Sequence, residues 1–259
     1  MRLTLLFRCL AGLAGALLLT SARAAPAAPA PLRVCLPDLE GLPYLNAPGQ
    51  PPGLMERLMV EAGRRSGLPV QVSRVPIRRC LLQMRQGEID GTVAGWNEAN
   101  QQLGRFPMKG DSADPARRIV RLSVVWVQRR DAPLQWDGRR FSNAAGQPVT
   151  IGTLRAVAMV ANALQLQGYR LEDSSASVHQ LLLQLRGRRA DAAVALDDQV
   201  RRELKTGGFD DLEMLPGTTT QHDFYVVVQR QRYDASPRLI ESFWETLARL
   251  RESPAYQPR

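Results

Sequence analysis

Two segments of the chain, residues 81–94 and 182–195, repeat one pattern without a gap. Each reads as the end of an amphipathic helix, a turn that contains glycine, an aspartate (Asp90 or Asp191) and a short apolar strand. We expect these aspartates to fix the turns before the strands. Helix, turn and strand also recur by chance in α/β proteins, but a near-gapless match favours two similar α/β lobes. Such lobes face each other across a cleft, where a ligand site is expected.

The first 24 residues have the features of a secretory signal peptide. Arg2 and Arg8 flank the start of an apolar stretch at residues 9–19, and Ala22-Arg23-Ala24 fits a small-residue cleavage site. The apolar stretch is too short to span a bilayer, and no lipobox precedes Cys9. Residues 25–31 read as an Ala/Pro tether. We therefore expect a signal peptide at 1–24, a tether at 25–31 and a mature periplasmic chain without a membrane helix.

The mature chain is expected to carry a moderate positive charge. Cleavage after Ala24 removes Arg2, Arg8 and Arg23 and no acidic residue, so the net charge of +9 becomes +6. The other arginines occur as scattered pairs, whereas a nucleic-acid-binding face gathers basic residues with aromatic ones. We expect no nucleic-acid partner, and only a mild attraction for anionic ligands or membrane surfaces.

Two cysteines, Cys35 and Cys80, remain after cleavage. In an oxidising compartment such a pair often forms a disulfide, and a pair of buried free thiols is the alternative. Cys35 ends the first expected strand and Cys80 follows the second, so the two can meet at one sheet edge. A catalytic cysteine is not expected, because the two histidines, His179 and His222, lie in the far half of the sequence.

Apolar periodicity with Gly and Pro between the segments predicts the order of the elements. Two late apolar strands, 121–128 and 224–229, are each followed by arginine and are expected to cross between the lobes as a paired hinge. Lobe 1 would then comprise residues 32–122 and 225–259, and lobe 2 residues 123–224. The other expected strands are 32–36, 70–75, 92–94, 149–152 and 192–196, and the expected helices are 54–66, 80–85, 157–167, 177–186 and 237–251.

Several short motifs follow one another in order from Leu32 to Leu250. The first lobe has Leu-Arg-Val at its start, Gly53-x-x-x-x-Leu58, Val75-Pro76 and Leu82-x-x-x-x-Gly87-x-x-Asp90-Gly91. The second lobe and the return strand have Val149-Thr150-Ile151-Gly152, Asp191-Ala192-Ala193-Val194 and Phe224-Tyr225-Val226-Val227-Val228. Their order resembles family 3 of the periplasmic solute-binding proteins. This resemblance implies an α/β chain with a two-lobed, type II periplasmic binding protein-like fold that closes on a small polar ligand, often an amino acid. Pro76–Cys80 and Phe106–Lys109 resemble a subgroup whose ligand is generally unassigned.

The chain departs from the amino-acid binders of that family where those proteins hold the ligand. Their loop after the third strand carries a threonine soon followed by an arginine, whereas here the threonine is missing and Arg105 comes later. Their Gly-Thr-Thr segment in the second lobe is replaced by Arg155-Ala156-Val157-Ala158. Their amino-group aspartate corresponds to either Asp197 or Asp198. The resemblance therefore does not by itself imply an amino acid as the ligand.

Seven residues follow strands at the edge where α/β sheets present their loops to ligands. Aromatic residues there would form a wall of the cleft or pack on their own lobe. Arginines would hold an anion through two parallel hydrogen bonds or lie at the surface. The asparagine would hydrogen-bond a ligand, and the aspartate would contact it or cap a helix. These candidate ligand-binding residues are Tyr44, Arg79, Trp96, Asn97, Arg105, Arg155 and Asp197.

Enzyme activity is not expected. The sequence has no Ser-His-Asp order, HExxH motif or Cys/His cluster, so we predict no catalytic residue, metal or cofactor. A hydro-lyase derived from a binding protein is the enzyme alternative, with Glu98 as its acid. The expected function is capture of a small polar, anionic ligand by a monomer, which presents it to an inner-membrane permease. A sensor partner of a signalling receptor is the other possibility.

Overall fold

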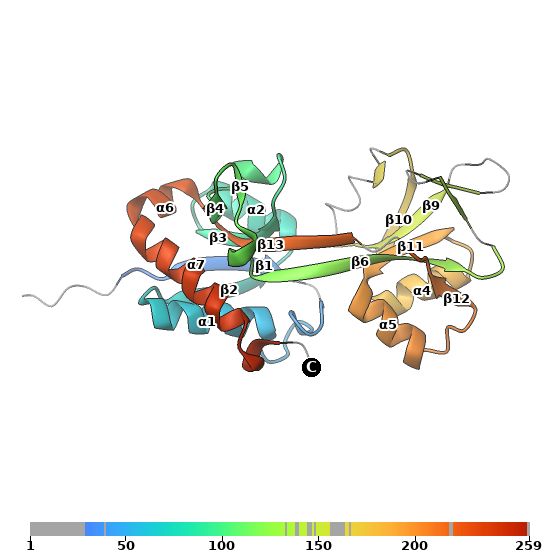
Figure 1. Cartoon of the computed structure of the whole chain (residues 1–259), viewed down its shortest axis with the longest axis horizontal. Helices are drawn as coiled ribbons and strands as arrows, with labels where there is room; N and C mark the ends of the chain where they lie inside the picture. The colour runs from blue at the N-terminus through green and yellow to red at the C-terminus, as the bar shows by residue number, and fades with distance from the viewer. Residues whose placement is uncertain are drawn as a thin grey trace, which may run out of the picture.

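The structure is a computed structural model. It describes residues 29–257 except 39, 133, 138–139, 144–146, 148, 156–163, 166 and 218–219. The expected signal peptide, most of the tether and most of the expected helix 157–167 lie outside the described residues. Figure 1 shows two lobes with two long strands running from one to the other. Within the described ranges, no helix is long and apolar enough to cross a membrane.

A nine-stranded sheet extends through both lobes in the order β10-β9-β11-β6-β13-β3-β1-β2, with β12 paired to β6. In the first lobe β1 pairs in parallel with β2 and β3, and in the second lobe β9 pairs in parallel with β10 and β11. The inner strands β1, β3, β9 and β11 have mostly apolar, buried sequences, as strands covered on both faces should. The edge strands β2 and β10 are more polar. The bounds of the strands are β1 Leu32–Pro37, β2 Val70–Val75, β3 Gly91–Gly95, β9 Thr150–Leu154, β10 Arg170–Ser175, β11 Ala192–Leu196 and β12 Leu212–Met214.

The two crossing strands are β6 (Val120–Arg129) and β13 (Thr220–Val228). Residues 120–124 of β6 pair antiparallel with residues 220–224 of β13. Beyond this overlap β13 pairs with β3 in the first lobe, and β6 pairs with β11 in the second. The prediction of two crossing strands is confirmed. The strand β13 begins earlier than expected because its first residues, Thr220–Asp223, are polar and give no apolar signal.

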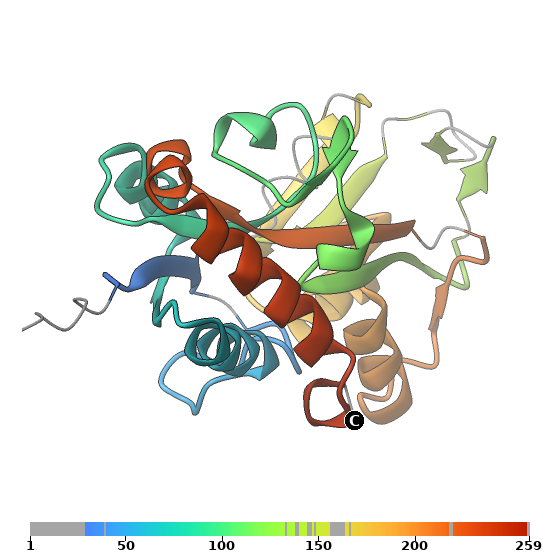
Figure 2. The same ribbon diagram turned by 60° about the vertical axis from the view of Figure 1, so that its left-hand side comes forward.

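In the first lobe, α1 (Leu54–Ser66) and α7 (Pro237–Arg251) pack together over the sheet, as Figure 2 also shows. The N–H of Gly53 donates to Glu56 Oε2 (2.7 Å) at the start of α1. Gly67 ends the helix in the left-handed conformation, with φ 77°. Apolar residues of both helices form one core with β1 and the ends of the crossing strands. The predicted bounds of both helices are confirmed.

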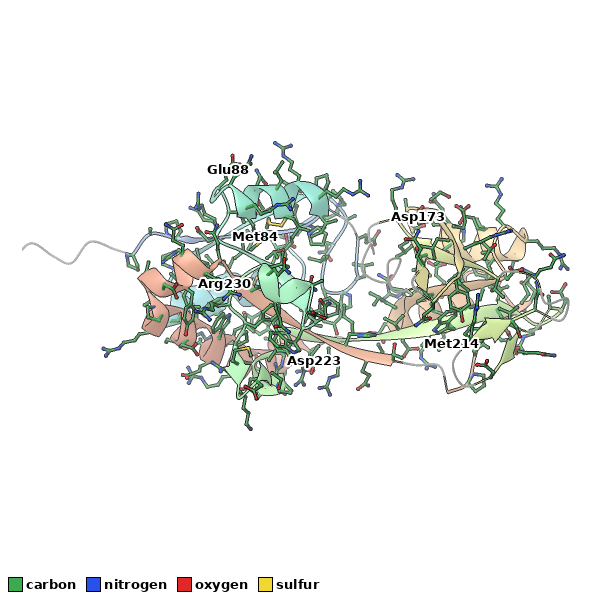
Figure 3. The ribbon with its side chains drawn as sticks, turned by 90° about the horizontal axis from the view of Figure 1, so that it is seen from above. Met84, Glu88, Asp173, Met214, Asp223 and Arg230 are labelled. Carbon is green, nitrogen blue, oxygen red and sulfur yellow. A yellow bond between two sulfur atoms is a disulfide. The ribbon has the colours of Figure 1, made fainter. Side chains whose placement is uncertain are left out.

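The opposite face of this lobe carries α2 (Ile77–Arg85). Cys35 of β1 and Cys80 of α2 form a disulfide with a Cα–Cα distance of 5.8 Å, so the predicted bridge is confirmed. Both cysteines are buried against Met84, and Figure 3 shows the bridge beside this residue. The helix begins at Ile77 rather than at Cys80, because Pro76 supplies its N-cap position.

In the second lobe, α4 (Val178–Arg186) and α5 (Asp197–Thr206) pack together against β6 and β11. Ser177 caps α4 by accepting a hydrogen bond from Gln180 N (3.2 Å). Neither α5 nor β10 is among the predicted elements, because α5 is mostly charged and β10 is a largely polar edge strand. The remaining elements are η1 Asn100–Gln102, β4 Met108–Lys109, β5 Ser112–Ala113, η2 Pro115–Arg117, β7 Gln135–Trp136, β8 Phe141–Ser142, α6 Arg230–Ala235 and η3 Pro254–Tyr256.

Candidate functional site

The carboxyl ends of the parallel strands in the two lobes point toward each other. In the first lobe the last residue of β3, Gly95, pairs with Phe224, which is one end of the overlap between the crossing strands. In the second lobe the last residue of β11, Leu196, pairs with Val124, which is the other end of that overlap. Since the neighbouring strands are parallel to β3 and β11, their carboxyl ends lie at the same two edges. Open α/β sheets bind ligands at this edge.

Trp96 and Asn97 directly follow β3 at the edge of the first lobe. The Trp96 ring meets the Phe106 ring edge to face, with 5.0 Å between centroids. Asn97 Oδ1 accepts a hydrogen bond from the backbone N–H of Asn100 (2.8 Å). Both residues are therefore held by their own lobe, and both are still partly exposed to solvent.

Tyr44 lies in the loop between β1 and α1 and packs partly buried against the core of the first lobe. Its carbonyl accepts a hydrogen bond from Met55 N (3.1 Å), which ties the loop to the start of α1. Burial raises the pKa of the Tyr44 hydroxyl, and the negative charge of Asp198 raises it further. Because Asp198 belongs to the first turn of α5, this electrostatic effect acts between the two lobes.

Two arginines of the first lobe were expected at the same edge, and they differ in position. Arg79 lies exposed in the first turn of α2, directly after β2. Arg105 instead pairs through its backbone with Val228, at the opposite end of β3 from Trp96. Its guanidinium lies 5.9 Å from the ring centroid of Tyr233, on α6. The structure therefore does not bring Arg105 together with the other candidates, because the loop after β3 folds back along β13.

The edge of the second lobe carries Arg155 and Asp197. Arg155 follows β9, is exposed, and donates from Nη2 to the backbone carbonyl of Ser174 (2.8 Å). Asp197 is the first residue of α5, and its carboxylate lies 2.8 Å from Arg201 Nε. A carboxylate at this position is stabilised by the helix dipole, so Asp197 has a structural role in addition to its candidate role.

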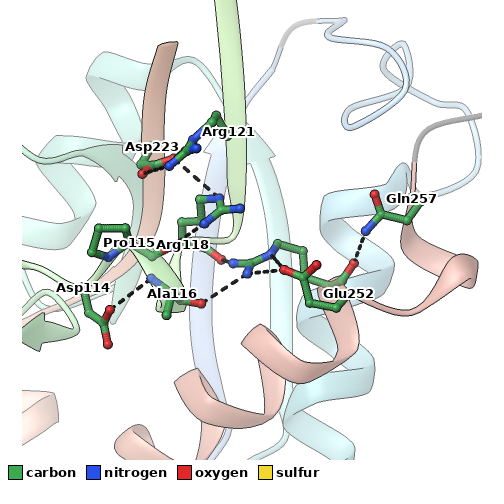
Figure 4. Close-up of polar contacts among 9 residues, drawn as sticks. Asp114, Pro115, Ala116, Arg118, Arg121, Asp223, Glu252 and Gln257 are labelled. Atoms are coloured by element: carbon green, nitrogen blue, oxygen red, sulfur yellow. Dashed lines mark hydrogen bonds and ion pairs between the residues drawn. The ribbon is translucent and has the colours of Figure 1, made fainter.

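One arrangement at the crossing strands was not expected from the sequence. Arg121 and Asp223 are partners across β6 and β13, and both oxygens of Asp223 accept from the Arg121 guanidinium (2.7 and 2.8 Å; Figure 4). The hydrogen bond from Arg121 is the main cause that lowers the pKa of Asp223. The two residues are 102 positions apart, and only the strand register brings them together.

Six of the seven candidate residues thus follow strands that end at the facing edges: Tyr44, Arg79, Trp96 and Asn97 on the first lobe, and Arg155 and Asp197 on the second. Among the residues that the structure describes, no group of three or more His, Cys, Asp or Glu could hold a metal ion. These candidates supply aromatic surface, guanidinium donors and a carboxamide at the two edges.

No family model matches the sequence, and no curated protein matches it. Solved structures match over most of the chain. The ligand-binding core of GluR0 from Nostoc punctiforme, in complex with L-glutamate, is 13% identical, with a TM-score of 0.59 over 88% of this chain and 96% of that one. Holo ArgBP from T. maritima is 19% identical, with a TM-score of 0.58 over 86% and 91% of the two chains.

A histidine kinase sensor domain with similarity to periplasmic binding proteins is 16% identical, with a TM-score of 0.60 over 86% of this chain and 91% of that one. At such low identities these matches establish the fold alone. The chain has a two-lobed periplasmic binding protein fold, and the predicted fold class is confirmed.

Proposed function

We propose that this chain is an exported solute-binding protein, related to family 3, that captures a small polar, anionic ligand by closure of its two lobes. The observation that carries the proposal is the geometry of the crossing strands, which turns the carboxyl ends of both sets of parallel strands toward each other. A rotation about this short overlap would bring the two edges together without breaking either core. Lobe 1 would comprise residues 32–122 and 225–259, and lobe 2 residues 123–224.

The ligand would be held by side chains from both edges. Arg79 and Arg155 are exposed guanidinium groups on opposite lobes, and they would share the negative charge of a carboxylate or similar group. Trp96 and Tyr44 would cover the ligand, and Asn97 would donate a hydrogen bond. Closure would exclude water from these contacts and strengthen them, because the local dielectric falls. Arg105 is left out of the proposed site, since it lies beside α6.

The partner would be a protein of the inner membrane. The signal-peptide features of residues 1–24 and the disulfide between Cys35 and Cys80 both support a periplasmic location. A permease would receive the ligand from the closed form. A sensory role is the second candidate, and it is supported by the histidine kinase sensor domain that shares the fold at a similar TM-score.

A screen of small anions by thermal shift, followed by calorimetry, tests the proposal. We expect Arg155→Ala to weaken binding of a ligand found in the screen by a few kcal/mol, because a desolvated anion loses its partner. Arg105→Ala is a matched control, since it also removes an exposed arginine, and its affinity should equal that of the wild type. Small-angle scattering should show a more compact protein with ligand. The proposal is wrong if Arg155→Ala binds normally and the scattering curve does not change.

A further inference from the structure

A hollow of about 220 Å³ lies beside the hinge, on the first lobe. Its walls come from four separated parts of the chain: Tyr44 in the loop after β1, the start of α1, the residues that lead into and begin β6, and the end of α7 with the segment that follows it. Part of the lining is apolar or aromatic and includes Leu54, Leu58 and Tyr256. The lining also contains three arginines, Arg118, Arg121 and Arg251, and one acidic residue, Glu252. The hollow therefore combines an apolar surface with a cationic one.

The positive charge of this arginine group is not fully balanced. Three guanidinium groups face two carboxylates, those of Asp223 and Glu252, as Figure 4 shows. Arg121 takes both oxygens of Asp223, and Arg251 pairs with Glu252. One guanidinium, that of Arg118, is left to share a carboxylate that is already engaged.

Of these three arginines, Arg118 has the positive charge that carboxylates neutralise least. Its Nε lies 3.5 Å from Asp223 Oδ1, is shielded from solvent, and makes no hydrogen bond. Its Nη1 donates to the carbonyl of Pro115 (2.6 Å). Burial lowers the pKa of Arg118, and the positive charges of Arg251 and Arg121 lower it further. An anion in the hollow would offset this repulsion and replace the hydration that burial removes from the guanidinium.

We propose that the hollow is a second binding site, which adjoins the facing edges through Tyr44 but includes neither Arg79 nor Arg155. It would take a small organic anion with an apolar body and one carboxylate or phosphate group. Guanidinium groups bind both anions through paired hydrogen bonds, and the side formed by Leu54, Leu58 and Tyr256 would cover the body. The volume suits a ligand smaller than the drug-sized molecules that fill pockets of about 300 Å³ or more.

Calorimetry on the mature protein with four probes tests this site: benzoate, phenyl phosphate, inorganic phosphate and neutral benzamide. We expect benzoate or phenyl phosphate to bind at one site, and inorganic phosphate and benzamide to bind about tenfold more weakly or not at all, because each lacks one half of the recognised chemistry. The two organic anions distinguish a carboxylate from a phosphate ligand. The proposal is overturned if neither binds, or if benzamide binds as well as they do.

Variants locate the binding. Arg118→Gln should weaken binding of the organic anion by about tenfold or more. Arg130→Gln is the matched control, because Arg130 is also an ion-paired arginine but lies on the second lobe beside Glu213. Tyr256→Ala keeps every ion pair and removes one apolar wall. It should therefore weaken binding of phenyl phosphate and leave the affinity for inorganic phosphate unchanged. The site is contradicted if both Arg118→Gln and Tyr256→Ala bind the organic anion with wild-type affinity. It is also contradicted if Arg118→Gln and Arg130→Gln lose affinity equally.

Arg155→Ala separates this site from the one between the lobes. Binding of benzoate or phenyl phosphate should persist in this variant, since Arg155 lies on the second lobe after β9. If Arg155→Ala abolishes it, the anion occupies the facing edges, and the second site is wrong while the proposed function stands.

Discussion

Asp90 and Asp191 make the same two backbone contacts in the two lobes. Asp90 donates its N–H to Arg33 O and accepts the Arg33 N–H on Oδ2, both at 2.8 Å. Asp191 does the same with Thr150, also at 2.8 Å in both directions. Each aspartate thereby fastens the turn before an inner parallel strand to the first parallel strand of its lobe. The repeated segments of the sequence are thus equivalent in structure, and the expected role of both aspartates is confirmed.

The two aspartates differ in one respect, and this difference predicts their contributions to stability. Asp90 is buried and also accepts two hydrogen bonds from the Arg33 guanidinium (2.8 and 3.0 Å). Asp90→Asn should lower the free energy of unfolding by about 1–3 kcal/mol. We expect no larger loss, because the Arg33 side chain is partly exposed and solvent weakens its ion pair with Asp90. Asp191→Asn should lower the free energy of unfolding by about 0.5–1.5 kcal/mol. Urea denaturation of the three proteins measures the difference, and an equal cost at both positions would contradict it.

Asp90 also predicts a dependence of stability on pH. Burial raises the pKa of this carboxyl, but the hydrogen bonds and charge of Arg33 outweigh burial and hold the pKa below its usual value. The stabilisation is therefore complete above the pKa of the unfolded chain, about 3.9, and is lost as pH falls through the folded pKa. Wild-type stability should decline more steeply below about pH 4 than that of Asp90→Asn. Parallel slopes would show that another carboxylate is responsible.

The disulfide between Cys35 and Cys80 should stabilise the first lobe strongly. It closes a loop with a sequence separation of 45 residues, and the chain-entropy relation gives about 4 kcal/mol for a loop of this size. The double variant Cys35→Ser/Cys80→Ser should lose about that much in unfolding free energy at any pH above 4. Mass spectrometry of the native protein after thiol labelling provides the control, since the wild type should take up no label.

The elements that the sequence predicts well are those whose burial follows a simple period. In α1 and α7 the apolar residues lie on one face, and Gly67 or Pro237 marks an end, so the predicted bounds agree with the structure. The strand β11 is likewise a short apolar run between turn residues, whereas β2 carries its valines among polar residues and is only partly buried. In contrast, β10 is polar because it is an edge strand, and its pattern does not differ from that of a loop.

Contacts between distant segments explain what the sequence does not predict. The sequence places Arg105 in the loop after β3, where an anion clamp was expected, but the loop returns along β13 and places this residue beside Tyr233. Arg118 and Arg251 appear in the sequence as ordinary surface arginines. They meet only because α7 runs back to the start of β6, where Arg251 hydrogen-bonds the carbonyl of Arg118.

Arg129 should be essential for the packing of the second lobe. It is buried, and its Nη1 donates to the carbonyls of Leu185 and Ala190, both at 2.9 Å, where α4 ends. Arg129→Met would leave two buried carbonyls without this donor and should cost about 2–4 kcal/mol. Arg130→Met, at the neighbouring exposed position, should change stability by about 0.5 kcal/mol or less. Hydrogen exchange in α4 should accelerate in the first variant only, and equal exchange in both would refute this role.

Gly53 is predicted to tolerate no side chain. A Cβ at this position would lie 2.3 Å from the carbonyl oxygen of Tyr44, so Gly53→Ala must displace the backbone of the loop that carries Tyr44. We expect a loss of about 1–3 kcal/mol and a change in Tyr44 fluorescence or NMR signals. Gly49→Ala is the comparison in the same loop: its φ of +82° is unfavourable, but its Cβ would meet nothing within 4 Å. It should cost about 1 kcal/mol and leave Tyr44 in place.

The electrostatic effect of Asp198 on Tyr44 offers a way to follow how the two lobes approach each other. Burial and then the charge of Asp198 raise the pKa of the Tyr44 hydroxyl. Removing that charge in Asp198→Asn should therefore lower the pKa of Tyr44. Asp210→Asn, at an exposed position beside Arg130 just beyond the end of β6 that lies away from β13, should leave it unchanged. A titration of tyrosine ring carbons by NMR, with Tyr44→Phe to assign the signal, reports the value. Lobe closure on a ligand should raise the pKa of Tyr44 further, because both burial and the approach of Asp198 increase. A pKa that stays the same in Asp198→Asn would mean that Tyr44 responds only to its own lobe.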